Sequence, residues 1–342
     1  MGPGLRAVGS RALRHPVLLA TPLALAAVGM GFASRALLLP PDSSGQKDVL
    51  DALMAPPPAA SALRGATTSL TSGQPSPAGA DPGRSLRARR LGSPARGQNP
   101  GGGNGSVLNL DIRVALLKLS RQPSIGGEGP WRVVSRDGQV LRQGQGGGDT
   151  SAEELLGSLA EVWIESLDGR PLRADGRAYD GRLRVLRATD GIQVVNHLPL
   201  ESYVSSVVGG EMPSGWNREA LRAQAVAARS YAMAHMARPA SEHWHLGDTT
   251  RWQNYEGLSS VSAPTREATT STAGVILSYQ GGIVESLYAA TQQIVDEAHG
   301  NLGASMSQTG AQELARQGLR FNDILSHYYQ GASLARLQLG AN

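Results

Sequence analysis

The spacing of apolar residues changes along the chain, and the changes divide it into three segments. Residues 17–33 are almost all apolar, whereas residues 42–106 contain few large apolar side chains. Beyond Ser106, apolar residues return at the regular intervals expected of strands and helices. The pattern predicts an N-terminal segment (1–41), a linker (42–106) and one folded domain (107–339).

The first half of the folded domain has the alternation of apolar and polar residues that predicts β-strands. Asp-Gly pairs, which favour tight turns, separate the alternating runs. The pair that follows Arg136 predicts a hairpin between the runs that begin at Trp131 and Gln139. Ser151, with Glu154 three residues later, predicts the start of a short helix. We expect this half to form a meandering antiparallel sheet.

The second half contains the pattern of a long amphipathic helix that begins after Asn217 and ends near Ala237. Asn217 is a favoured N-cap residue, and Glu219 in the first turn complements the helix dipole. A narrow stripe of small and aliphatic residues would let this helix approach another element closely; it consists of Leu221, Ala225, Ala228 and Ala232. A strand-rich half followed by this helix predicts an α+β fold.

The N-terminal segment has the features of an export signal. Arginines precede the apolar run of residues 17–33, which is short for a helix that crosses a bilayer. Small residues near Ala33 would permit cleavage, whereas Arg35 directly after the run also fits an uncleaved membrane anchor. The sequence therefore predicts export to the cell envelope, by a segment that is either removed or retained.

The linker is rich in Pro, Gly and Ser, and such a composition cannot bury enough apolar surface to form a core. Its basic residues 84–90 either are solvated or contact an anionic membrane surface or wall polymer. Much of the excess positive charge behind the net charge of +4 lies in this linker and at the N-terminus. The folded domain is nearly balanced, so a nucleic-acid-binding surface is not expected.

The sequence contains no cysteine, which excludes disulfides, thiolate catalysis and cysteine-ligated metal sites. The chemistry is therefore sought among other side chains, and the main candidate is Glu211. Two glycines precede it and would permit unusual backbone angles or the close approach of a bulky group. Pro213 biases Met212 away from helix. By residue type alone, a glutamate before a helix is more often structural than catalytic.

Several motifs resemble the stage II sporulation protein D family, also called the amidase-enhancer family. They are Leu-Pro-Leu-Glu-x-Tyr at 198–203, Glu-Met-Pro at 211–213 and the helix motif Glu-Ala-Leu-x-Ala-Gln-Ala-Val-Ala-Ala-Arg-Ser-Tyr at 219–231. The segment from Ala-His-Gly to Gln-x-Gly-Ala, at 298–311, resembles the closing motif of the family. The resemblance extends over about residues 112–337.

This resemblance implies a lytic transglycosylase that cleaves the glycan strands of peptidoglycan, with Glu211 as general acid and base. One carboxyl group suffices for that route, whereas a hydrolase normally uses two. Asp296 and Glu297 are the candidates for a second carboxylate, with surface positions as the other interpretation. The zinc site of some members of that family uses cysteine, which this sequence lacks, so we expect no cofactor or metal ion. The resemblance also implies residues that bind the glycan or orient the catalytic group: Gln224, Arg229, Tyr231, His299, Ser307 and Gln308.

Structural interpretations of several residues stay open beside these roles. Arg229 could instead hold the fold through a carboxylate such as Glu201. The hydrogen bonds of His299, Ser307 and Gln308 could brace a loop. Trp252 and Tyr255 could stack on sugar rings or belong to the core. A metal site is only weakly indicated, because the nearby histidines lack a clear third ligand; the residues concerned are His243, His245 and Asp248.

The segment after Tyr288 departs from the family pattern, because it is short and has Gln292 and Gln293 where glycines are expected. We then expect a lid or part of the glycan groove to be missing or rebuilt. This keeps open a non-catalytic module that binds glycan or enhances a cell-wall amidase. A third hypothesis is a scaffold that recruits wall enzymes through the linker, but no feature of the sequence supports it.

Overall fold

The computed structural model describes residues 89–90, 110–300 and 304–337. The predicted N-terminal segment (1–41) and most of the predicted linker (42–106) lie outside the described residues. Within the predicted linker, however, β1 (Arg89–Arg90) pairs antiparallel with β17 (Ser333–Arg336), so this part joins a sheet. None of the helices in the described ranges is long and apolar enough to span a membrane.

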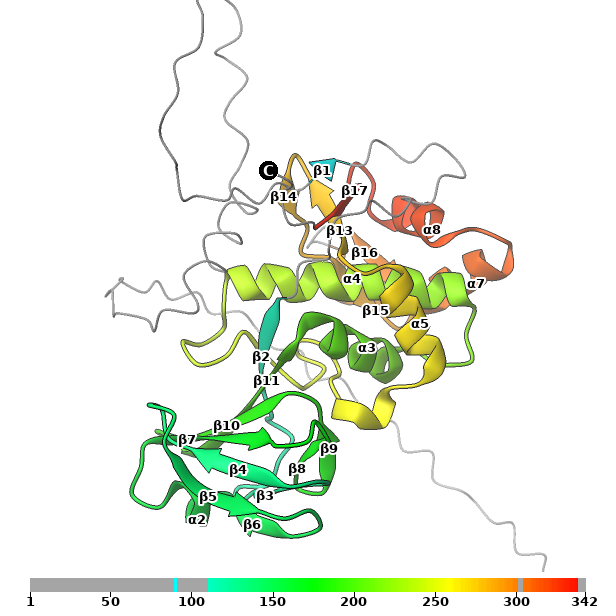
Figure 1. The fold of residues 1–342 in the computed structure, drawn as a ribbon. Coiled ribbons are helices and arrows are strands. Elements are labelled where there is room, and N and C mark those ends of the chain that lie inside the picture. Colours follow the sequence, from blue (N-terminus) through cyan, green and yellow to red (C-terminus); the bar gives the residue numbers. More distant parts are fainter. Residues whose placement is uncertain (1–88, 91–109, 301–303, 338–342) are drawn as a thin grey trace, which may run out of the picture. The chain divides into compact units, whose positions relative to one another are not determined.

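The described part of the chain has an α+β fold, which confirms the predicted class (Figure 1). The largest sheet has the order β12-β2-β11-β10-β7-β4-β5. Its strands are β2 (Asp111–Ala115), β4 (Trp131–Val134), β5 (Val140–Gly144), β7 (Glu161–Ser166), β10 (Arg182–Ala188), β11 (Gly191–Pro199) and β12 (Leu246–Gly247). A smaller sheet, in the order β6-β3-β8-β9, consists of β3 (Ser124–Gly127), β6 (Asp149–Ser151), β8 (Leu172–Ala174) and β9 (Arg177–Tyr179).

The remaining strands accompany the helices. The sheet β1-β17-β13-β14 also contains β13 (Val275–Tyr279), beside β17, and β14 (Gly282–Ile283), at one edge. A separate pair of parallel strands consists of β15 (Leu287–Ala289) and β16 (Ser305–Ser307). The helices are α2 (Ala152–Leu156), α3 (Leu200–Glu211), α4 (Arg218–Ala237), α5 (Ala263–Ser271), α6 (Gln292–Ile294), α7 (Gln308–Arg316) and α8 (Phe321–Tyr328). A 3-10 turn, η2 (Gly257–Ser260), and a π-helical turn, η3 (Val295–His299), complete the set.

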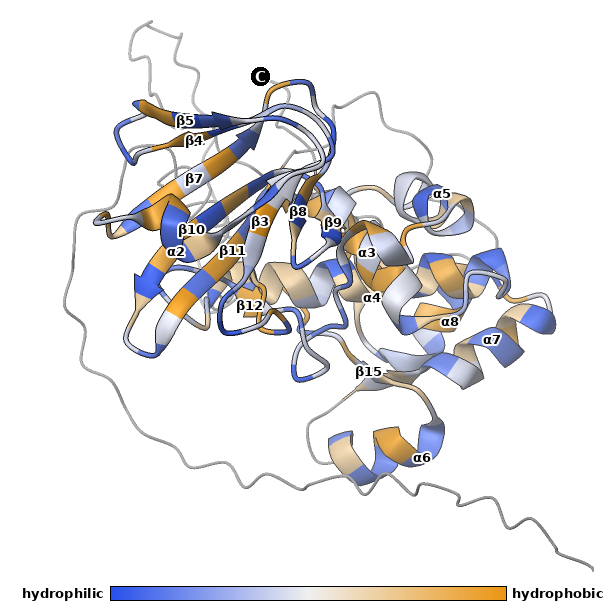
Figure 2. Cartoon of the chain, turned by 90° about the horizontal axis from the view of Figure 1, so that it is seen from below, coloured by the Kyte–Doolittle hydropathy of each residue, from blue (hydrophilic) through white to orange (hydrophobic). Residues whose placement is uncertain are grey.

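Alternating residues of the largest sheet form the first part of the core, and Figure 2 shows this alternation along its strands. The predicted hairpin is present between β4 and β5, where the Ser135 amide donates to the Gln139 carbonyl at 2.9 Å and Gly138 has a φ of 85°. The predicted meander is only partly correct. Strand β2 pairs with β11, far along the chain, with Ala115 opposite Val195.

The predicted start of α2 is confirmed at its N-cap. The Ser151 hydroxyl accepts a hydrogen bond from the Glu154 amide at 3.4 Å. The Glu154 carboxylate accepts from Arg142 of β5 at 2.7 Å, so its partner is a strand residue. The cap therefore forms, and the carboxylate ties the helix to the edge of the sheet.

The long predicted helix is α4, and the C-terminal half assembles around it. The Asn217 side chain accepts from the Glu219 amide at 2.9 Å, which confirms the predicted cap. The predicted stripe of Leu and Ala residues is fully buried. Because these side chains are small, α3, α5, α7, α8 and β13 can all contact α4 (Figure 1).

A buried ion pair joins α3 to α4. The guanidinium group of Arg229, fully buried, donates to both carboxylate oxygens of Glu201, at 2.8 and 2.7 Å. Its other contacts are the carbonyls of Ala225, Thr269 and Val275. Each nitrogen of the group thus has a partner inside the protein, which corrects the predicted glycan contact of Arg229. The structural alternative, a partner in Glu201, is what the structure has.

Removing this guanidinium should be costly. We expect Arg229→Ala to lower the free energy of unfolding by about 3 kcal/mol, because it leaves a half-buried carboxylate and buried carbonyls without donors. Urea denaturation of the full chain would measure the loss. Arg142→Ala, which breaks the exposed pair with Glu154, is the matched control and should cost less than about 1 kcal/mol. Equal losses in the two variants would contradict the importance given to the buried pair.

Candidate functional site

Glu211 is the last residue of α3, and its position depends on the two glycines before it. Gly209 and Gly210 both have helical backbone angles, so the unusual angles that the sequence left open are not present. A Cβ on Gly209 would collide with the Ser260 carbonyl, and one on Gly210 with the Asn254 carbonyl. The glycines therefore allow the segment 254–260 to lie directly against the end of the helix.

Two other segments donate hydrogen bonds to the Glu211 carboxyl group. The Asn254 backbone amide donates to Oε1 at 2.8 Å, and the Gln308 side-chain amide donates to Oε2 at 3.2 Å. Gln308 is the first residue of α7. Each oxygen thus has a partner, and three parts of the chain that are far apart in sequence meet at one half-buried carboxyl.

Burial raises the pKa of Glu211 above its usual range. The hydrogen bonds from Asn254 and Gln308 and the positive charge of Lys118 lower the pKa, but they only partly offset the effect of burial. The group therefore keeps its proton to a higher pH than an exposed glutamate. A carboxyl group in this state stays available as a proton donor at higher pH than an ordinary glutamate.

Neutral polar side chains surround Glu211. The Tyr203 hydroxyl donates to Gln253 Oε1 at 2.9 Å, and Gln253 Nε2 donates to the Tyr288 hydroxyl at 2.8 Å. Burial is the main cause of the raised pKa values of Tyr203, Tyr231 and Tyr288, and the charge of Glu211 raises each of them further. All three tyrosines are therefore neutral hydrogen-bonding groups close to the carboxyl.

The structure separates the predicted glycan-binding residues into two groups. Gln308 contacts Glu211 directly, and buried Tyr231 lies within reach of its charge. Gln224 is on the same face of α4 as Tyr231, two turns earlier. It is fully buried, and neither atom of its amide has a hydrogen-bond partner.

The other predicted residues near the chain end make local contacts. Ser307 caps α7 by accepting from the Gly310 amide at 3.1 Å. The Nδ1 atom of His299 lies 2.8 Å from the Ser305 hydroxyl. Burial lowers the pKa of His299. Both contacts match the loop-bracing alternative.

The candidates for a metal site do not cluster. Nδ1 of His245 accepts from the Arg113 backbone amide at 3.0 Å, and Asp248 accepts from the Leu117 amide at 2.9 Å. Across residues 110–300 and 304–337, no group of three His, Cys, Asp or Glu side chains could hold a metal ion. Tyr255 is a core residue, and half-buried Trp252 packs edge-on against Trp244.

The candidates for a second catalytic carboxylate are Asp296 and Glu297, from the sequence, and Glu285, from the structure. Asp296 and Glu297 are exposed and accept hydrogen bonds from Gln292 and Gln293, which agrees with their surface interpretation. Glu285, not singled out from the sequence, acts electrostatically on the same Tyr231 as Glu211 does.

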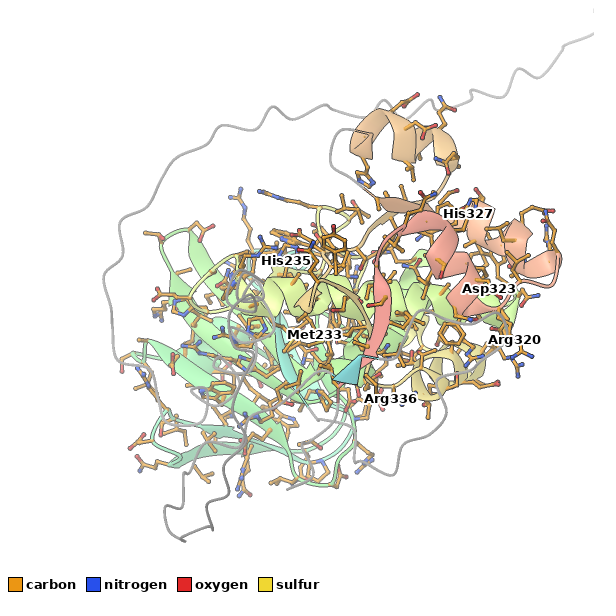
Figure 3. The ribbon with its side chains drawn as sticks, turned by 90° about the horizontal axis from the view of Figure 1, so that it is seen from above. Met233, His235, Arg320, Asp323, His327 and Arg336 are labelled. Carbon is orange, nitrogen blue, oxygen red and sulfur yellow. The ribbon has the colours of Figure 1, made fainter. Side chains whose placement is uncertain are left out.

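Two side chains at the C-terminal end of α4 lie close to Glu285, and Figure 3 labels one of them, His235. His235 of α4 lies 3.5 Å from it and Arg238 lies 2.7 Å from it. Interaction with His235 is the main cause of the lowered pKa of Glu285, and Arg238 lowers it further. The pKa of Glu211 is thus raised above that of an ordinary glutamate, whereas the pKa of Glu285 is lowered below it.

Sequence reasoning missed most of the groups that hold Glu211, above all Asn254 and Lys118. Gln253 and Tyr288 fall in segments that resemble the family, but their contacts with each other do not follow from the sequence pattern.

Comparison with known proteins places this geometry in a known context. A family model described as Stage II sporulation protein matches residues 188–279. This region contains α3, α4 and the segment that donates to Glu211, whereas most strands of the largest sheet precede it.

Three relatives are similar to parts of this chain. An uncharacterised protein of Brachyspira hyodysenteriae is 36% identical over 190 residues, 52% of this chain and 51% of that protein. The amidase enhancer of Bacillus subtilis is 33% identical over 102 residues, 30% of this chain and 14% of the enhancer. Stage II sporulation protein D of the same organism is 33% identical over 114 residues, 29% of this chain and 33% of that protein. The chain thus spans about half of the first relative and less of the other two.

The raised pKa of Glu211 predicts how its charge affects stability. The folded state binds the carboxyl proton more tightly than the unfolded state does, so folding loses stability as pH rises from the usual 4.5 through the raised pKa. Glu211→Gln has no proton to lose, and its amide can still accept from Asn254. We expect its free energy of unfolding, relative to the natural chain, to increase between about pH 4 and about pH 8. Urea denaturation at the two pH values measures this; a difference that stays constant or shrinks would contradict the prediction.

Proposed function

The chain belongs to the stage II sporulation protein D and amidase-enhancer family, and on this premise we propose that it is a lytic transglycosylase that cleaves peptidoglycan glycan strands. The observation that carries the proposal is the state of Glu211. Its carboxyl group is half-buried, has a raised pKa, and is held by one backbone and one side-chain amide. These are the properties of a group that gives up a proton and takes one back at the same position.

The reaction uses Glu211 twice. The protonated carboxyl group donates its proton to the glycosidic oxygen while the bond from that oxygen to C1 of the sugar breaks. The carboxylate that results then accepts the proton of the C6 hydroxyl of the same sugar, and the C6 oxygen bonds to C1. The product carries an anhydro ring, and no water is consumed.

The neighbours of Glu211 suit this cycle. Gln308 and the Asn254 amide donate to the carboxylate and so stabilise it after the first proton transfer. They carry no charge, so they do not hold the group permanently ionised. The proton taken from the C6 hydroxyl in the second step restores the acid, and the burial of Glu211 favours this protonated form.

The glycan would be bound by polar side chains near this carboxyl. Gln308 is the first candidate because it already contacts Glu211, whereas Tyr231 and Gln224, which are buried on one face of α4, are candidates for orienting the catalytic group. His299 and Ser307 are candidates from the closing segment, although their hydrogen bonds in this state are local. Acetamido and hydroxyl groups of the wall sugars are partners that such amides and hydroxyls can bind.

A second function is favoured by one relative. The Bacillus subtilis protein named amidase enhancer shares 102 aligned residues with this chain. A non-catalytic module that binds glycan strands and enhances a cell-wall amidase would bind without turnover, and the short segment after Tyr288 fits that role. Either function places the protein in the cell envelope, exported or anchored through its N-terminus.

Product analysis tests the main proposal. Intact and peptide-stripped peptidoglycan would be incubated with the full chain and with Glu211→Gln, and the products identified by mass spectrometry. We expect anhydro-ended fragments from the natural chain and at least about a hundredfold fewer from the variant, because general acid–base catalysis is lost. Binding to the glycan should be retained in the variant.

Two further variants separate the alternatives. Glu297→Gln, an exposed carboxylate of η3, is the matched control and should keep the natural rate. Glu285→Gln tests for a second catalytic carboxylate: reducing-end products that disappear in this variant would indicate a hydrolase with two carboxylates. Glycan binding without any cleavage by the natural chain would leave the amidase-enhancing module.

A further inference from the structure

A lysine outside the matched family region is bonded to the segment that holds Glu211. Lys118 lies three residues beyond the end of β2, and its ammonium group donates to Asn254 Oδ1 at 2.6 Å. It also donates to Glu256 Oε1 at 2.7 Å and to the Tyr255 carbonyl at 3.3 Å. The family model begins at residue 188. The lysine therefore comes from a part of the chain that the family match does not cover.

Asn254 connects this lysine to Glu211. Its backbone amide donates to Glu211 Oε1 at 2.8 Å, and its Nδ2 donates to the Gly210 carbonyl at 2.8 Å. An ammonium group can only donate, so the end of the Asn254 amide that faces Lys118 must be the oxygen. Nδ2 is then directed to Gly210. Lys118 thus fixes the orientation of the side chain that ties the last turn of α3.

Lys118 is itself held in place. The carboxylate of the buried Asp248 accepts from the backbone amides of Leu117 at 2.9 Å and Lys118 at 3.4 Å. Glu256 pairs with the ammonium group and also with Arg177 at 3.4 Å. The carboxylates bonded to Lys118 are therefore Asp248 and Glu256, and neither of them is on α3.

We propose that Lys118 is a positioning residue for Glu211 and that it acts through the side chain of Asn254. The inference rests on the proposed function, because it assigns a role in the same reaction. Without the ammonium group, only the bond to the Gly210 carbonyl orients the Asn254 amide, and the contact of Asn254 with the end of α3 becomes less rigid. The carboxyl group then spends less time at the position from which it transfers protons.

Loss of the lysine also has an electrostatic consequence. Its charge lowers the pKa of Glu211, so its removal raises that pKa. The other titratable groups that face Glu211 are Tyr203 of α3, Tyr231 of α4 and Tyr288 of β15, which are neutral. They cannot replace the missing charge. The alkaline limb of the pH–rate profile should therefore move to higher pH.

A double-mutant cycle tests the positioning role in the full chain. Lys118→Met is expected to lower kcat about tenfold with little change in KM, because it acts on the geometry of catalysis and not on glycan binding. In the background of Asn254→Ala the same change should lower kcat less than about twofold, since the connection is already broken. Independent, multiplicative effects of the two changes would overturn the proposal.

Two variants separate this role from a general loss of charge or of folding. Lys118→Arg keeps a cation that can donate to Asn254 and should recover most of kcat. Arg177→Met removes a cation from the same Glu256 carboxylate while the Lys118–Asn254 bond stays in place, and it should leave kcat near the natural value. A loss of kcat in Arg177→Met equal to that in Lys118→Met would contradict the proposal.

A readout without turnover keeps the two proposals distinguishable. The Glu211 carboxyl carbon can be followed by NMR in protein labelled with 13C at glutamate Cδ, with Glu211→Gln for assignment. Its titration should move to higher pH in Lys118→Met and stay unchanged in Arg177→Met. If the natural chain does not cleave glycan, the proposed function fails, whereas an unmoved titration in Lys118→Met sinks the role of Lys118.

Discussion

The close contact between the end of α3 and the segment 254–260 is the constraint on which the site depends. It exists because Gly209 and Gly210 have no side chains: a Cβ on either would collide with a backbone carbonyl of that segment. At this separation the Asn254 amide reaches Glu211, and the Ser260 hydroxyl donates to the Ser206 carbonyl at 2.8 Å. Larger residues would move the segment away and leave the carboxyl without its backbone donor.

The two glutamates at opposite ends of α3 have partners of different chemistry. Glu201 receives two bonds from a buried guanidinium, and this ion pair joins α3 to α4. Glu211 receives bonds from amides and is surrounded by neutral tyrosines. One end of the helix is thereby fixed by charge, while the other end keeps a carboxyl whose proton can leave and return. The rigid end supports the reactive one, because both belong to the same three-turn helix.

Local features were predictable from the sequence, and long-range contacts were not. The cap at Asn217, the hairpin between β4 and β5 and the start of α2 follow from residues within a few positions of each other. The pairing of β2 with β11 and the bond between Lys118 and Asn254 depend on how the whole core packs, which no short window contains. Arg229 shows the limit most clearly: its charge predicted an anionic partner, but not whether that partner was a side chain or a ligand.

The segment between β12 and η2 receives contacts from two sides, and these contacts make the largest sheet part of the site. On one side, the Asp248 amide donates to the Ala115 carbonyl of β2 and the Tyr255 hydroxyl donates to Asn196 of β11 at 2.6 Å. On the other side, Asn254 bonds the end of α3. A sheet that served only as a separate binding module would have no such bonds to the segment that carries the donor of Glu211. Its strands therefore act on the carboxyl through the loop, in addition to any surface that they offer to a ligand.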